Sequence, residues 1–140
     1  MKLHPRIKNG IAVASGILIG SFVNMGFISI SSSIIPPPKN ADITTIEGLK
    51  ATMHLFEPKH FILPFLAHAL GTLVGANMAS RFAVSHPMRL AMLIGIFFLI
   101  GGIANVFMLP SPGWFTITDL VAAYLPMAYL GWKITQNKIN

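Results

Sequence analysis

Four long apolar segments that carry almost no charged side chains decide what this chain can fold into. A helix needs about 20 predominantly apolar residues to cross the hydrocarbon layer of a bilayer, which is roughly 30 Å thick. Three of the segments meet that length, and the fourth is expected to thin the bilayer or to lie partly in its interface. The sequence therefore predicts one all-α transmembrane domain over residues 1–140, an integral membrane four-helix bundle with spans at residues 10–35, 60–84, 88–108 and 117–132.

Composition supports this prediction and excludes several classes of protein. Charged residues make up 10% of the 140 residues, against roughly a quarter in soluble domains. The chain has no cysteine, which excludes disulfides, thiolate catalysis and Cys-ligated metals. The first apolar segment is longer than the 7–15 residues of a signal-peptide core, so we expect an uncleaved anchor.

The distribution of charge predicts the orientation in the membrane. Seven basic residues fall at one end of the predicted spans, while three basic and all four acidic residues fall at the other. Positively charged loops remain in the cytoplasm, so we expect a multi-pass protein of the bacterial cytoplasmic (inner) membrane with both termini cytoplasmic. Its partners are then membrane lipids and not nucleic acid, in spite of the net charge of +6. The cytoplasmic set is Lys2, Arg6, Lys8, Arg81, Arg89, Lys133 and Lys138, and the outer set is Lys39, Lys50, Lys59, Asp42, Glu47, Glu57 and Asp119.

The outer loop between the first two spans carries an apolar stripe of its own. Ile46, Leu49, Met53 and Phe56 recur at spacings of three and four residues, which is typical of an amphipathic helix. We predict a short helix over about residues 45–57 that lies on the outer interface and covers the bundle like a roof.

Small residues predict how the spans pack. Gly16 and Gly20 in the first span and Gly71 and Gly75 in the second are each four residues apart, a spacing that lets two helix backbones approach closely in a membrane. We expect these two faces to pack against each other or against copies of the chain in a homo-oligomer. Pro64 and Pro126 each remove a backbone donor within a span, so kinks are expected there.

No Asp, Glu, Lys or Arg lies deep in any span, but weaker polar groups gather in the outer half. If they converge, they form a polar pocket that opens outward beneath the loop helix. The predicted pocket residues are Asn24, His54, Glu57, His60, His68, Asn105, Asp119 and Tyr124.

Each of these residues also has a purely structural explanation. Asp119 follows Thr116 by three residues, as in a capping box, and Glu57 before Pro58 suits the start of a helix. His68 could hydrogen-bond a neighbouring span, and the asparagines could join helices.

In the order of its spans and outer helix, the chain resembles other small four-span bacterial inner-membrane proteins, a group with no defined activity. The resemblance implies a fold and a location but no reaction. Small multidrug exporters have a similar length, but their first-span glutamate has no counterpart in residues 10–35.

Three functions remain open. The first is a small non-enzymatic binding, transport or accessory subunit whose pocket takes a neutral or amphipathic ligand, with no cofactor. The second is a metal-dependent enzyme at the outer leaflet, in which His54, Glu57, His60 and His68 hold a divalent metal. The third is a purely structural oligomer built through the glycine faces.

Overall fold

Every regular element in the described part of the chain, residues 3–139, is a helix, so the predicted all-α class is confirmed. The structure is a computed structural model, and Lys2 of the predicted cytoplasmic set lies outside the described residues. The α-helices are α1 (Pro5–Ile34), α2 (Ile46–Thr52), α3 (Ile62–Phe82), α4 (Pro87–Met108), α5 (Gly113–Ala122) and α6 (Leu125–Ile139). Two short 3₁₀ helices, η1 (Met53–Leu55) and η2 (Pro58–Phe61), lie between α2 and α3.

Three helices are long and apolar enough to cross a membrane, and they fit a membrane protein. They are α1, the continuous helical stretch Pro58–Phe82 and α4. Pro64 lies in the first turn of α3, where a missing N–H breaks no hydrogen bond within the helix, so it does not interrupt the span.

The predicted fourth span over residues 117–132 is not one helix. It consists of α5 and α6, which are separated at Ala123 and Tyr124. Pro126 supplies no N–H to the carbonyl of Ala122, and in the structure α5 ends at Ala122 and α6 begins at Leu125. The expected kink at Pro126 is therefore a complete break, and neither piece is long enough to cross a bilayer alone.

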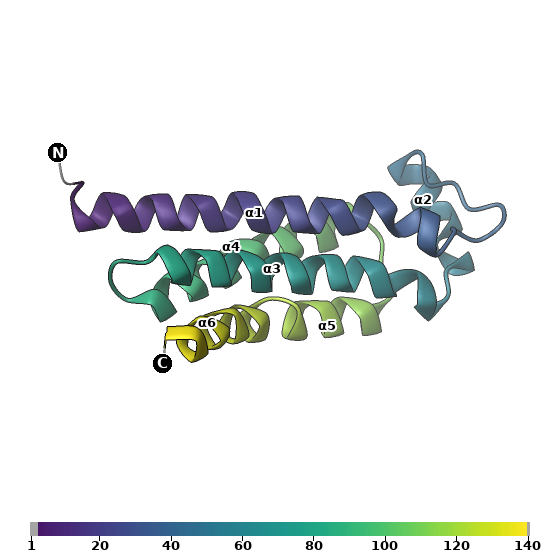
Figure 1. Cartoon of the computed structure of the whole chain (residues 1–140). Helices are drawn as coiled ribbons and strands as arrows, with labels where there is room; N and C mark the ends of the chain where they lie inside the picture. Colours follow the sequence, from purple (N-terminus) through teal and green to yellow (C-terminus); the bar gives the residue numbers. More distant parts are fainter. Residues whose placement is uncertain (1–2, 140) are drawn as a thin grey trace.

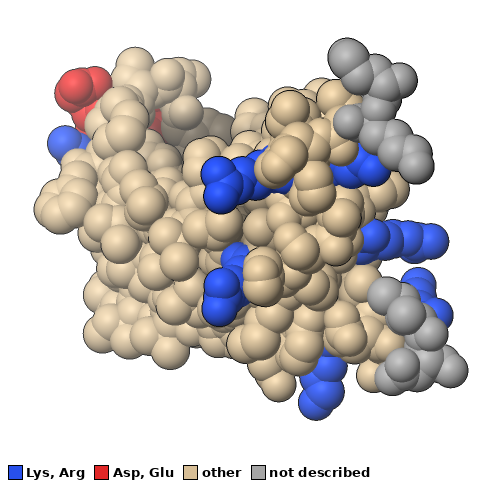
Figure 2. Space-filling view, turned by 90° about the vertical axis from the view of Figure 1, so that its left-hand side faces the viewer, with Lys and Arg blue, Asp and Glu red and all other residues tan. Residues whose placement is uncertain are grey.

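α1, α3, α4 and the α5–α6 pair alternate in direction and form one bundle, and α5 and α6 run the same way (Figure 1). α1, α3 and the α5–α6 pair run side by side, with α4 behind them, and α2 lies at the end opposite the two termini. Lysine and arginine side chains gather at the end that carries the termini (Figure 2). The described basic residues of that end are Arg6, Lys8, Arg81, Arg89, Lys133 and Lys138.

α1 and α3 are in close backbone contact, and glycine makes this contact possible. A Cβ atom built on Gly16 would lie 2.6 Å from the carbonyl oxygen of Gly75, and one built on Gly20 would lie 2.6 Å from that of Gly71. Real Cβ atoms do not approach an oxygen so closely, so only glycine fits. The two glycine faces are thus occupied by each other within a single chain.

α2 begins at a local network of polar side chains. Thr45 caps the helix by accepting a hydrogen bond from the Gly48 N–H at 2.9 Å. Asp42 accepts hydrogen bonds from the Thr44 hydroxyl at 2.6 Å and from the Thr44 N–H at 2.9 Å. These hydrogen bonds from Thr44 hold the pKa of the Asp42 carboxyl below its ordinary value. The hydrogen bonds from Thr44 therefore favour the ionised form of Asp42 in this loop.

This preference predicts an acid-sensitive loop. Since the pKa of Asp42 is lower in the folded protein, its contribution is present above the ordinary value of 3.8 and is lost as the pH falls through the lowered pKa. We expect the Thr44 amide resonance to move toward its unfolded position below pH 3.8 in an NMR titration. Asp42→Asn should leave that resonance without this acid transition, and an unchanged titration in the variant would contradict the assignment.

Candidate ligand-binding site

A histidine and an aspartate from two different helices form a hydrogen-bonded pair inside the bundle. His68 on α3 places Nδ1 2.9 Å from Oδ1 and 2.9 Å from Oδ2 of Asp119 on α5. The two side chains are 16% and 7% exposed, respectively. A buried ion pair is retained only with close geometry and further hydrogen bonds, and both conditions hold here.

Tyr124 supplies the further hydrogen bond. Its hydroxyl donates to Oδ2 of Asp119 at 3.0 Å, and its ring stacks on the imidazole of His68 with centroids 5.8 Å apart. The break between α5 and α6 places Tyr124 where its side chain can reach back to α5. Gly102 on α4 makes room for it, since a Cβ there would collide with the phenol ring.

Removing this hydroxyl should weaken the site measurably. Tyr124→Phe is expected to lower the free energy of unfolding by about 1.5–3 kcal/mol, because the Tyr124 hydroxyl donates to a charged acceptor in a buried place. Reversible unfolding in mixed micelles measures the loss. Tyr129→Phe is the matched control, since Tyr129 is 41% exposed. Equal stability of the two variants would show that the Tyr124 hydrogen bond contributes nothing.

The ion pair borders a cavity of about 380 Å³ at the α2 end of the bundle. Its walls are largely apolar and come from the five helices α1 to α5 and from both 3₁₀ helices, with Leu49 contributed by α2 and Met53 by η1. No lysine or arginine lines it. Its polar residues are Asn24, His60, His68, Asn105, Ser111, Thr116 and Asp119.

A smaller cavity of about 220 Å³ adjoins the first one. Tyr124, Thr72 and His68 line it, and no aspartate, glutamate, lysine or arginine does. Oδ1 of Asn24 is buried without a hydrogen-bond partner among the described residues. The larger cavity therefore continues into a smaller space that also contains hydrogen-bonding groups. Four residues line both cavities: Asn24, His68, Gly102 and Asn105.

The structure brings six of the eight predicted pocket residues to these cavities and leaves two outside. His54 and Glu57 are exposed and line neither cavity. Glu57 instead pairs with Lys59, with Oε2 and Nζ 3.0 Å apart. Lys59 holds the pKa of Glu57 below its ordinary value, chiefly through this hydrogen bond. The six residues at the cavities are Asn24, His60, His68, Asn105, Asp119 and Tyr124.

The predicted metal set is not assembled. Within residues 3–139, no three His, Cys, Asp or Glu side chains form a group that could hold a metal ion. Nδ1 of His60 instead accepts a hydrogen bond from the Glu57 backbone N–H at 2.9 Å, as part of the turn that begins η2.

Two structural explanations from the sequence have different outcomes. Glu57 is the N-cap residue of η2, as its position before Pro58 indicates. The capping box at Thr116 and Asp119 is wrong, because α5 begins at Gly113 and its N-cap is Pro112. Asp119 lies well inside α5, where it is available to His68.

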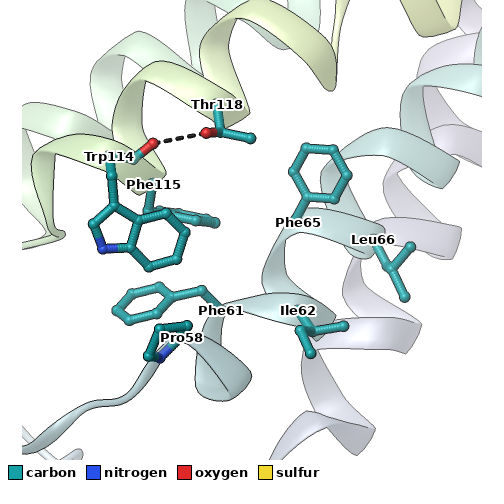
Figure 3. Close-up of a pocket in the computed structure, with 8 residues that line it drawn as sticks. All are labelled: Pro58, Phe61, Ile62, Phe65, Leu66, Trp114, Phe115 and Thr118. Atoms are coloured by element: carbon teal, nitrogen blue, oxygen red, sulfur yellow. Dashed lines mark hydrogen bonds between the residues drawn. The ribbon is translucent and has the colours of Figure 1, made fainter.

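Sequence reasoning missed the aromatic wall beside the site. Phe61 and Phe115 lie with ring centroids 4.8 Å apart, and both line the larger cavity. They also line an apolar groove of about 200 Å³ between α3 and α5 (Figure 3). The two rings therefore separate the cavity from this groove. The pair Trp114–Phe115 was the available signal, but alone it indicates only an interfacial position.

Comparison of the chain with protein-family models, with curated proteins and with solved structures found no match. The class of protein therefore follows from the helices themselves. The chain is an all-helical protein with three apolar helices compatible with a membrane protein.

Proposed function

We propose that this chain is a multi-pass protein of the bacterial cytoplasmic membrane that binds a small amphipathic molecule in the cavity beneath α2. Both termini are cytoplasmic in this proposal, because the basic residues gather at the end that carries them (Figure 2). The α2 end and the cavity then belong to the outer half of the membrane. α5 and α6 together form the fourth wall of the bundle.

The observation that carries the proposal is the character of the cavity lining. Met25 and Ile28 of α1, Met53 and Phe56 near α2, and Val106 of α4 offer apolar contacts. Hydrogen-bonding residues are the minority of the lining, and two of them, His68 and Asp119, are paired with each other. Ligand sites are typically apolar cavities in which a small number of polar groups fix the orientation of the ligand. A cavity of about 380 Å³ also falls within the usual size of such sites.

The two alternatives have less support. A metal-dependent enzyme would require His54 and Glu57 beside His68, and these side chains are directed elsewhere. A structural oligomer through the glycine faces would require faces that α1 and α3 already use for each other.

Native mass spectrometry of protein released gently from its membrane tests the proposal. Wild-type protein should retain one amphipathic molecule per chain, and Val106→Trp should not, because the indole would fill the cavity that Val106 lines. Ile103→Trp is the matched control on the same helix, at a residue that is 41% exposed and does not line the cavity. A wild-type protein without a bound amphiphile, or equal retention by the two variants, would contradict the proposal.

A further inference from the structure

We infer that the head group of the ligand is neutral and accepts a hydrogen bond from Nε2–H of His68, as the carbonyl oxygen of a ketone, ester or amide does. This inference rests on the proposed function and adds the chemical class of the ligand to it. Three observations support the inference: the charges around Asp119, the partners of His68 and the lining of the two cavities.

The charges around Asp119 favour a pair that carries a proton, because without it the buried negative charge would be balanced by hydrogen bonds alone. Asp119 is almost fully buried, and an ionised carboxylate in such a place must be compensated by a nearby cation. No lysine or arginine lines either cavity, and Tyr124 offers a hydrogen bond but no positive charge. Within the described residues, His68 is the one titratable group that contacts Asp119 and can supply the compensation.

The position of the proton then fixes the character of Nε2. A neutral pair consists either of a protonated imidazole and a carboxylate, or of a neutral imidazole and a protonated carboxyl group. In the first case both ring nitrogens carry hydrogen; in the second, Nδ1 accepts from Asp119 and Nε2 carries the hydrogen. Nε2 of His68 is therefore a hydrogen-bond donor in both arrangements.

The surroundings of His68 leave that donor for a ligand. Nδ1 is engaged by both oxygens of Asp119, and Nε2 has no hydrogen-bond partner within the part of the chain that the structure describes. The imidazole lines both cavities. The apolar walls beneath α2 accommodate the hydrocarbon portion of the same molecule.

The same electrostatics exclude two other classes of head group. An anion would bring a second negative charge close to Asp119 without a lysine or arginine to balance it. A pure hydrocarbon would leave Nε2–H unpaired after water has been expelled, which costs binding free energy. A neutral acceptor avoids both penalties.

Three probes with the same chain length test this assignment: 2-tridecanone, tridecane and tridecanoate. They are added to protein with ¹⁵N-labelled histidine in bilayers of saturated phospholipid, and the Nε2–H resonance of His68 is followed by NMR. We expect a saturable shift with 2-tridecanone and none with tridecane. Tridecanoate should bind at least about ten-fold more weakly than the ketone.

A variant without the pair provides the control. His68→Leu, Asp119→Leu and Tyr124→Phe combined replace the polar site by apolar side chains of similar size, a change that buried ion pairs usually tolerate. This variant identifies the His68 resonance, and native mass spectrometry should show that it binds 2-tridecanone and tridecane equally well. Asn137→Leu, at an exposed residue of α6 outside both cavities, should bind the ketone like wild type.

The outcomes separate this inference from the proposed function. Equal responses to 2-tridecanone and tridecane, or preferred binding of tridecanoate, would overturn the head-group assignment. The proposed function would stand in that case if the native protein still retains an amphiphile that Val106→Trp excludes. Absence of any bound amphiphile in the native protein would overturn both.

Discussion

Replacement of His68 alone by leucine is expected to lower the free energy of unfolding by about 3–5 kcal/mol. The substitution leaves Asp119 buried without its cation, and breaking one partner of a buried ion pair typically has this cost. Asp119→Leu should lower the free energy of unfolding by a similar amount, because it leaves both His68 and the Tyr124 hydroxyl without their hydrogen-bond partner. Unfolding by sodium dodecyl sulfate in mixed micelles, followed by circular dichroism, measures both losses.

The combined variant His68→Leu, Asp119→Leu and Tyr124→Phe serves as the control for packing. It should recover most of the stability that either single leucine variant loses, since no polar group of the trio remains unpaired. If the combined variant loses as much stability as the single variants added together, the three side chains act independently. That result would contradict the coupling that their hydrogen bonds indicate.

Gly20→Leu is expected to lower the free energy of unfolding by about 3 kcal/mol or more, which is at the upper end of the cost of overpacking. The new side chain would have to occupy the position of the Gly71 carbonyl oxygen, which is backbone and cannot turn aside. α1 and α3 must separate, and the cavity that both helices line must change its shape. The same unfolding assay measures the loss.

Gly26→Leu is the matched control, because it lies on the same helix and a Cβ there meets nothing within 4 Å. This variant should be as stable as wild type, and it gains a little helix propensity. A destabilised Gly26→Leu, or a stable Gly20→Leu, would contradict the close contact between α1 and α3.

The sequence predicts the long helices well because their signal is local. Uninterrupted apolar runs bounded by Pro36 and Pro110 leave few alternatives in a membrane. The fourth segment shows the limit of that signal: its hydropathy resembles a span, but Pro126 ends the α-helical ladder and divides it into α5 and α6. Composition alone does not reveal whether a proline kinks a helix or ends it.

The candidate site follows the same pattern of partial success. The depth of Asn24, His68 and Asp119 along their segments could be counted from the sequence, and all three line the larger cavity. The pairing of His68 with Asp119 could not be foreseen, because helix rotation is set by side-chain packing between segments 51 residues apart. The course of the chain after α2 was equally hidden: His54 lies in η1, where its side chain is exposed and does not line the cavity.

The contacts of α1 and α5 with α3 differ in kind, and the two sides of the cavity wall therefore differ in how readily they can adjust. α1 meets α3 backbone to backbone at the glycines, with no flexible atoms between them. α5 meets η2 and α3 through the tips of side chains, where Phe115 contacts Phe61 of η2 and Asp119 contacts His68 of α3. Rotamer changes can adjust the second contact but not the first. If the cavity binds the ligand proposed above, the side formed by α1 and α3 is the fixed surface, and side-chain rotations on the α5 side adjust to the shape of the ligand.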